Sequence, residues 1–170
     1  MSVCETQRLI LRRMTGADGE FILELLNEPA FLRNIGDKGA RTIDDACRYI
    51  LTGPVASYEQ YGFGLWLVEL KEPSTPIGIC GLLKRESMKD VEIGFAFLSR
   101  FCQKGYASES AAAVMTLGRE SFGLNRISAI TAPDNQGSMK VLRKVGLEFK
   151  EMISLPEYET DRTLFMYEGN

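Results

Sequence analysis

The feature that most limits the possible folds is a strand–helix–strand pattern in the second half of the chain. An apolar run, VEIGFAFL (91–98), leads into a polar junction with one glycine, RFCQKGYASES (100–110). Small and apolar residues then recur at helical spacing over 107–122, and a second apolar run follows, RISAITA (126–132). A strand, a helix and a strand in this order form a βαβ unit, so the two strands are expected to be parallel neighbours.

Other segments add strands and helices around this unit. Apolar runs bounded by turn residues predict further strands at 7–14, 62–71, 76–84, 147–154 and 162–168, the last two as an antiparallel pair. Capping-box patterns predict helices over 17–27 and 42–53, and Gly53-Pro54 is expected to interrupt the second. Another helix is expected over 138–145. The pattern therefore predicts one α/β domain, of the α+β type, over residues 1–170.

Composition excludes several classes of protein and of site. The chain has 170 residues, a net charge of −3, four cysteines and no histidine. Without histidine, Ser-His-Asp and Cys-His nucleophile pairs are impossible. The cysteines form no C-x-x-C pair and no apolar run reaches the about 18 residues of a membrane span. We therefore expect a cytoplasmic protein with no metal site, no membrane contact and no nucleic-acid partner.

The junction before the expected helix has the chemistry of an anion site. A helix N-terminus offers unpaired backbone N–H groups and the positive end of the helix dipole. Gly105 and Ala107 leave the backbone accessible, and Lys104 adds positive charge. The Walker A pattern and the G-x-G-x-x-G dinucleotide pattern are both absent. An ordinary tight strand-to-helix turn is the alternative interpretation.

At this point the sequence resembles the GNAT N-acetyltransferase superfamily. The family's pyrophosphate loop, Q/R-x-x-G-x-G/A, matches Cys102-Gln-Lys-Gly105-Tyr-Ala107, with Cys102 in place of Gln or Arg. Together with APDNQGSMKVLRKVGLEF (132–149), the order of segments resembles the RimJ/RimL-like branch, some of whose members acetylate the N-termini of ribosomal proteins. The resemblance covers nearly the whole chain, from about Glu5 to Tyr167.

This resemblance implies a fold and a cofactor site. The GNAT fold is a mixed, mostly antiparallel twisted sheet with a central splayed parallel pair, flanked by helices. The resemblance implies that acetyl-CoA binds in the splay, its pantetheine arm along Phe97, Leu98 and Ser99 like an added strand. The pyrophosphate would lie on the amides of Gln103, Lys104, Gly105, Tyr106, Ala107 and Ser108.

Glu92 is the candidate general base. It interrupts an apolar run, and strand alternation places it on one face with Gly94 and Ala96, whose small side chains leave room beside the carboxylate. Charged residues that break a strand pattern cluster at functional sites. The alternative interpretation is an ion pair with an arginine of a neighbouring strand.

Asn135 and Ser138 are the other catalytic candidates. In the family, the residue matching Asn135 hydrogen-bonds beside the pantetheine arm, and the serine can face the thioester. From the residues alone, Asn135 reads as a turn residue and Ser138 as a helix N-cap. Leu142 occupies the position where many family members carry a tyrosine that protonates the leaving thiolate, so that acid is absent.

Several weaker assignments complete the site. Lys140 and Arg143 face the 3′-phosphate of CoA or form a solvated helix surface. Cys102 is expected to be a small apolar filler, because no histidine can activate it. Trp66, Phe63 and the glycine-rich segment 33–41 are expected to shape the acceptor pocket, with core packing as the alternative for Trp66.

The predicted function is acetyl-CoA-dependent transfer of acetyl directly to a primary amine, foremost the N-terminal α-amine of a protein or peptide. The alternatives are a small-molecule amine as acceptor, such as a polyamine, an amino acid or an antibiotic, and a non-catalytic acyl-CoA-binding domain. The expected partners are acetyl-CoA and the amine acceptor, with the chain a monomer or a homodimer.

Overall fold

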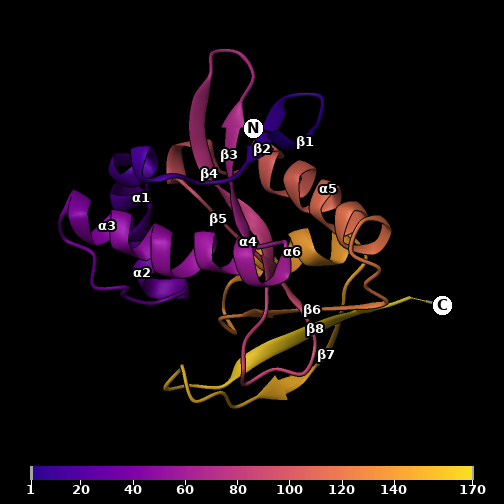
Figure 1. Cartoon of the computed structure of the whole chain (residues 1–170). Helices are drawn as coiled ribbons and strands as arrows, with labels where there is room; N and C mark the ends of the chain where they lie inside the picture. Colours follow the sequence, from indigo (N-terminus) through magenta and orange to yellow (C-terminus); the bar gives the residue numbers. More distant parts are fainter. Residues whose placement is uncertain (1, 170) are drawn as a thin grey trace.

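The computed structural model describes residues 2–169, which build one eight-stranded mixed sheet in the order β1-β2-β3-β4-β5-β6-β8-β7. Neighbouring strands are antiparallel except for β5 and β6, which are parallel. The sheet twists strongly from β1 to β7 (Figure 1). The strands are β1 Ser2–Glu5, β2 Leu9–Arg12, β3 Leu65–Leu70, β4 Thr75–Leu83, β5 Glu92–Phe97, β6 Arg126–Thr131, β7 Glu148–Ile153 and β8 Arg162–Glu168.

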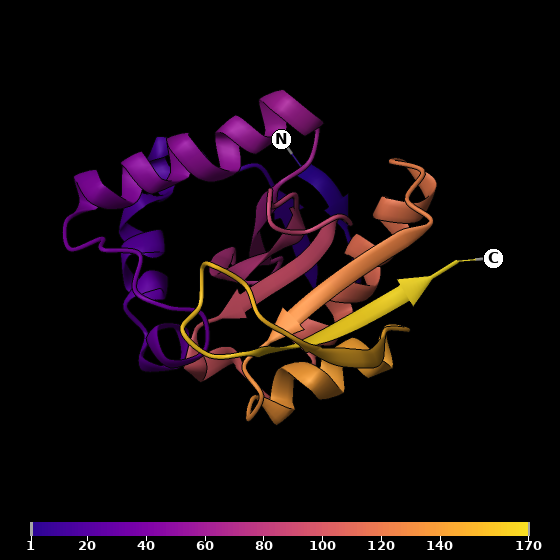
Figure 2. The same cartoon turned by 90° about the horizontal axis from the view of Figure 1, so that it is seen from below.

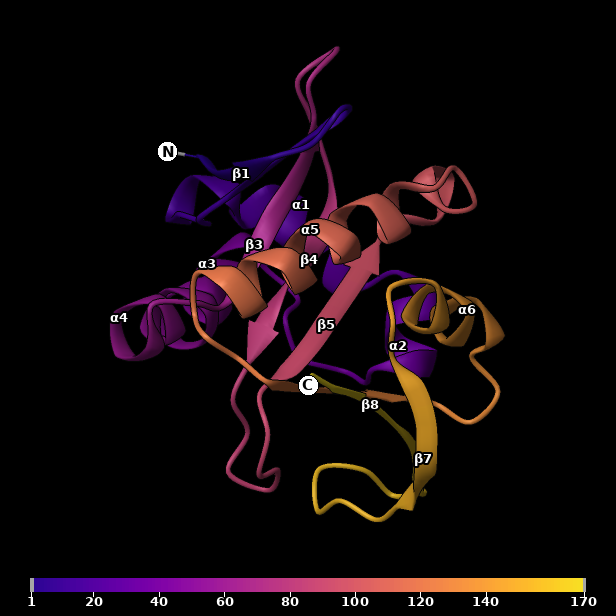
Figure 3. The same ribbon diagram turned by 90° about the vertical axis from the view of Figure 1, so that its right-hand side faces the viewer.

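The parallel pair is joined only where its strands begin. Glu92 and Ser128 are the one residue pair in register, and the Ser128 amide donates to the Val91 carbonyl at 2.8 Å. Beyond this point β5 continues to pair with β4, whereas β6 pairs with β8. Figure 3 shows β5 leaving β6, the strand that enters from the end of α5, as both proceed. The predicted splayed pair is therefore confirmed.

Helices cover both faces of the sheet. Helices α1 to α4 lie on one face, and α5 and α6 lie on the other (Figures 1 and 2). Their bounds are α1 Gly19–Leu26, α2 Pro29–Asn34, α3 Ile43–Ile50, α4 Ala56–Tyr61, α5 Tyr106–Glu120 and α6 Gln136–Lys144, with short 3-10 turns at Gly16–Asp18 and Ser99–Phe101. None of the helices within residues 2–169 is long and apolar enough to cross a membrane.

The helix expected to stop at Gly53-Pro54 continues instead. Leu51–Val55 adopts a π-helical turn that joins α3 directly to α4. Proline has no N–H to donate, so the helix absorbs Pro54 by widening one turn rather than by ending. Strand β1 and helix α2 were not predicted from the sequence. Both are short, at four and six residues, and lack a clear periodic pattern.

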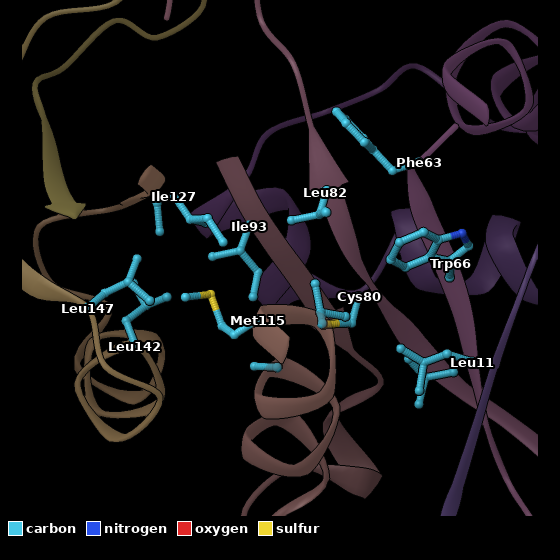
Figure 4. Close-up of a cluster of buried hydrophobic side chains, with 14 of the residues drawn as sticks. Leu11, Phe63, Trp66, Cys80, Leu82, Ile93, Met115, Ile127, Leu142 and Leu147 are labelled. Atoms are coloured by element: carbon cyan, nitrogen blue, oxygen red, sulfur yellow. The ribbon is translucent and has the colours of Figure 1, made fainter. Parts of the chain in front are cut away.

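Two apolar clusters form the core, one on each face of the sheet. Figure 4 shows the cluster between the sheet and helices α5 and α6, in which Leu142 lies with Met115 and Ile127. Trp66 belongs to this cluster and is 1% exposed. Strand β5 contributes to both clusters by alternation, because Ile93 packs under α5 whereas Ala96 packs under α1 to α3.

Candidate active site

The junction between β5 and α5 presents a row of free backbone amides. Gln103 and Gly105 both have positive φ, at 61° and 85°, so the chain turns sharply before α5. The first amide that donates into the helix is that of Glu109, which reaches the Gly105 carbonyl at 3.0 Å. The six amides from Gln103 to Ser108 have no acceptor within residues 2–169. Together with the helix dipole, these amides form a site suited to a phosphate group.

Arg8, which the sequence did not single out, holds this junction in place. Its guanidinium donates to the Lys104 carbonyl at 3.0 Å, pairs with Glu109 at 2.7 Å and stacks over the Tyr106 ring at 4.4 Å. A Cβ at residue 105 would lie 3.2 Å from Arg8 Nη2. The junction is therefore braced from outside by a residue of the loop before β2, and glycine at 105 accommodates both the positive φ and the brace.

Cys102 does not fill an apolar space, contrary to expectation. It is exposed, its amide closes the 3-10 turn on the Ser99 carbonyl, and its thiol contacts the Leu98 carbonyl at 3.6 Å. Partial burial raises the pKa of the thiol, and the nearby Glu28 carboxylate raises it further. Cys102 is thus a protonated hydrogen-bonding group rather than a reactive thiolate.

The backbone of β5 offers hydrogen-bonding groups to the gap beside β6. The Val91 carbonyl faces β6, where it accepts from Ser128, and the two-residue period of a strand turns the backbone of Phe97 the same way. The Leu98 amide instead donates towards β4, to Ile77 at 3.0 Å. The Ser99 amide donates to Glu28 at 3.0 Å. Of the three residues predicted to pair with the pantetheine arm, Leu98 and Ser99 thus have amides that already donate elsewhere, whereas the backbone of Phe97 faces the gap.

A cavity of about 520 Å³ opens on the opposite face of β5 from α5. Residues 92–96 of β5 line it, including Glu92, Gly94 and Ala96, which alternation placed on this face, and Ile130 of β6 lines it from across the gap. Its remaining walls come from β3, β4 and the β4–β5 loop, from α2 and the segment after it, from the continuous α3–α4 helix, and from the end of the chain at Tyr158 and Arg162. The cavity therefore joins the space beside Glu92 to the opening between the two splayed strands.

Glu92 is buried, at 3% exposed, and forms the ion pair that the sequence left as the alternative. Its partner is Arg85, whose Nε lies 2.8 Å from Oε1 and 3.3 Å from Oε2. Burial raises the pKa of Glu92 above its ordinary value, and the Arg85 guanidinium opposes part of that rise. A buried carboxylate with a raised pKa is suited to accept a proton near neutral pH.

Most of the other polar groups of the cavity were not predicted from the sequence. Tyr158 and Arg162, from the end of the chain, stack with 3.8 Å between guanidinium carbon and ring centroid. The segment 33–41, which was expected to shape the acceptor pocket, contributes Asn34, Ile35 and Lys38 to the cavity lining. Trp66 and Phe63 do not line it, because both point into the core. Arg85 lies in the loop between β4 and β5, two residues beyond Leu83, which pairs with Glu92.

Asn135 and Ser138 meet at the start of α6, but neither lines the cavity. Asn135 is the N-cap, and its side-chain oxygen accepts from the Ser138 amide at 3.2 Å. Ser138 is therefore the third residue of the helix, not the cap. Lys140 and Arg143 are exposed on α6, and Leu142 is 1% exposed in the core. Because β5 and β6 are parallel, α5 and α6 begin at the same edge of the sheet.

Comparison with known proteins identifies the family. Residues 8–148 match the family described as "Acetyltransferase (GNAT) domain". The chain belongs to the GNAT acetyltransferase family. It is 30% identical over 147 residues to an uncharacterized N-acetyltransferase, YoaA, of Bacillus subtilis, a match that covers 86% of this chain and 82% of that one. GNAT acetyltransferases use acetyl-CoA as the acetyl donor.

Solved GNAT structures share the fold at low sequence identity. RimL, a ribosomal L7/L12 alpha-N-protein acetyltransferase in complex with coenzyme A, superposes with a TM-score of 0.85 at 17% identity, covering 99% of this chain and 98% of that chain. The ribosomal-protein-S5-alanine acetyltransferase of Vibrio fischeri superposes with a TM-score of 0.81 at 18% identity, covering 100% and 97%. The splayed sheet of this GNAT protein is thus RimJ/RimL-like in architecture.

Proposed function

We propose that this GNAT protein transfers acetyl from acetyl-CoA directly to a primary amine, foremost the N-terminal α-amine of a protein or peptide. One observation carries the proposal: the cavity that holds the Glu92 carboxylate opens into the gap between β5 and β6. An amine in the cavity and a thioester in the gap would share one space. The fold shared with two ribosomal-protein acetyltransferases supports the choice of acceptor, and the continuous sheet supports a single domain over residues 1–170.

Acetyl-CoA, the donor, is proposed to bind on the side of the splayed pair opposite the cavity. The free amides of Gln103 to Ser108 are proposed to bind its pyrophosphate, and the gap-facing backbone of Phe97 its pantetheine arm. Leu98 and Ser99 shape this edge rather than pair with the arm. Asn135 and Ser138, at the start of α6, are proposed to border the thioester end. Lys140 and Arg143 are exposed cations on α6 with no ion pair within residues 2–169, and are proposed to bind the 3′-phosphate.

The chemistry requires a neutral amine, and Glu92 is proposed to take its proton. An α-amine with a pKa of about 7.8 is about 14% neutral at pH 7, a penalty of about 1.1 kcal/mol. For a lysine side chain with a pKa of about 10.4, the same penalty is about 4.6 kcal/mol. A buried carboxylate is a modest base, sufficient to deprotonate an α-amine and less suited to a lysine side chain. With Leu142 in the core, the thiol leaves as thiolate or is protonated by Ser138 or water.

Thiol release from acetyl-CoA, measured against a panel of peptides, polyamines, amino acids and aminoglycosides, tests this function. We expect turnover with peptides and the acetyl group on the α-amine, located by mass spectrometry. Calorimetry with acetyl-CoA is the parallel measurement. Binding without release on any acceptor would leave a non-catalytic acyl-CoA-binding domain, and turnover confined to small amines would reassign the acceptor.

A further inference from the structure

The cavity around Glu92 carries an excess of positive charge. Its acidic side chains are Glu92 and the exposed Glu86, whereas its cationic side chains are Lys38, Lys84, Arg85 and Arg162. Arg85 is matched by Glu92, and the Lys84 ammonium is held by the backbone carbonyls of Arg85 and Met88. The buried Arg162 and the exposed Lys38 remain without an acidic partner within residues 2–169. A cavity built only to accept a cationic amine would not be lined in this way.

Arg162 is the most informative of these groups. It is buried, at 9% exposed, and its Nη1 donates to the Asn34 carbonyl at 2.8 Å. Its buried Nε has no hydrogen-bond partner within the described part of the chain. Stacking on Tyr158 fixes the plane of the guanidinium but supplies no counter-charge. A buried charge without a compensating partner is costly, so its place in a cavity wall indicates a binding site for an anion.

The cationic groups converge beside the proposed base. The guanidinium carbon of Arg85 lies 5.8 Å from the centroid of the Tyr158 ring, and that of Arg162 lies 3.8 Å from it, so both guanidiniums adjoin the same ring. The Lys38 ammonium lies close enough to Arg85 and Glu92 to be affected by their charges. Partial burial lowers the pKa of its ammonium, the Arg85 charge lowers it further and Glu92 opposes both effects. The anion site therefore adjoins the carboxylate proposed to take the proton of the amine.

We propose that the acceptor carries a carboxylate a few bonds from its reactive amine, and that Arg162, with Lys38, binds this carboxylate. The inference rests on the proposed function and narrows it. Two kinds of acceptor carry such a carboxylate: a protein or peptide N-terminus with Asp or Glu in one of its first positions, or a free amino acid with its own α-carboxylate. Guanidinium and carboxylate form paired, charge-assisted hydrogen bonds, which favours this anion over an amide.

Matched acceptors test the inference. The rate constant kcat/KM is measured for two peptides that differ only in Asp or Asn at the second position, and for an amino acid and its amide. We expect the acidic member of one pair to be preferred by at least about tenfold, the scale of one charge-assisted hydrogen bond. The pair with the larger ratio identifies the source. Ratios near one in both pairs would overturn the inference and leave the proposed function intact.

Variants assign the preference to Arg162. Arg162→Gln is expected to bring the acid-to-amide ratio close to one, and Arg162→Lys to retain part of it. Arg119→Gln is the matched control, because Arg119 stacks on Tyr167 outside the cavity, with 5.4 Å between guanidinium carbon and ring centroid. Its ratio should equal that of the unaltered protein. An unchanged ratio in a folded Arg162→Gln protein would contradict the assignment.

A binding measurement separates this inference from the proposed function. Calorimetry with the N-acetylated Asp and Asn peptides needs no turnover, and melting curves confirm that each variant is folded. We expect tighter binding of the Asp peptide, or of the N-acetylated amino acid over its amide, and loss of the difference in Arg162→Gln. If no acceptor is acetylated but this difference is present, the anion site stands and the proposed activity fails. Equal binding within both pairs would overturn the anion site.

Discussion

The junction before α5 and the cavity beside Glu92 recognise their ligands by different means. The junction offers backbone groups: six amides that have no acceptor within residues 2–169, a sharp turn with positive φ at Gln103 and Gly105, and the dipole of α5. The cavity offers side chains gathered from α2, the β4–β5 hairpin and the β7–β8 loop. Backbone geometry tolerates many side chains, so the junction can be shared across a family, whereas the cavity can change its acceptor by changing a few residues.

The largest effect should come from the cavity. Glu92→Gln removes the proposed base but keeps an oxygen that can accept from Arg85, and we expect kcat/KM to fall by about 10² or more. Glu69→Gln is the control, because Glu69 also pairs with an arginine, Arg12 at 3.3 Å, away from the cavity. A loss of less than about threefold in Glu92→Gln across pH 6 to 9 would reject the base role.

The pH dependence sharpens the same point. Because burial raises the pKa of Glu92, its basic form is lost, and kcat/KM should fall, as pH drops through that raised value. The neutral fraction of the acceptor amine also falls as the pH drops, because an α-amine has a pKa of about 7.8. The pH profile of kcat/KM for Glu92→Gln should keep the decline caused by protonation of the acceptor amine and lack the decline caused by protonation of Glu92. Identical profiles for both proteins would assign the entire pH dependence to the acceptor.

A smaller effect is expected at the junction. Gly105→Ala places a Cβ at φ 85° and 3.2 Å from Arg8 Nη2, a strain of about 1–2 kcal/mol. We expect the Kd of acetyl-CoA to rise about tenfold. Gly123→Ala is the matched control, because Gly123 also has positive φ, 64°, but no heavy atom within 4 Å of its added Cβ. Both variants should lose stability, and only the first should lose affinity. Equal acetyl-CoA affinity in both would contradict the proposed pyrophosphate site.

The smallest effect concerns the brace. Arg8→Gln removes the contacts to Lys104 and Glu109 that fix the junction, but the Arg8 side chain is exposed, and ion pairs at the surface contribute about 0–1 kcal/mol. The Kd of acetyl-CoA should rise by no more than about fivefold, as calorimetry would measure. Arg126→Gln, which removes exposed pairs with Asp90 and Glu168, is the control and should leave the Kd unchanged. A larger loss in Arg8→Gln would indicate direct contact with the ligand.

The two regions also differ in how far the sequence predicts them. The junction, the parallel pair and the side of β5 that carries Glu92 follow from local patterns, so all three could be predicted. The cavity depends on contacts across the chain: Arg162 bonds Asn34 over 128 residues, and Arg85 reaches Tyr158 over 73. No periodicity encodes such pairs. Cys102 and the Gly53-Pro54 turn were predicted wrongly because their surroundings, not their residue types, set their roles.

The separation between the donor site and the acceptor cavity is tested most directly by titrating acetyl-CoA into Glu92→Gln in a calorimeter. Glu92 lies at the paired beginning of β5, whereas the proposed donor contacts lie at and beyond its end. The predicted result is a Kd within about threefold of the unaltered protein, alongside the large loss of kcat/KM. A Kd that rises as much as kcat/KM falls would contradict the account, because Glu92 would then act by supporting the donor site.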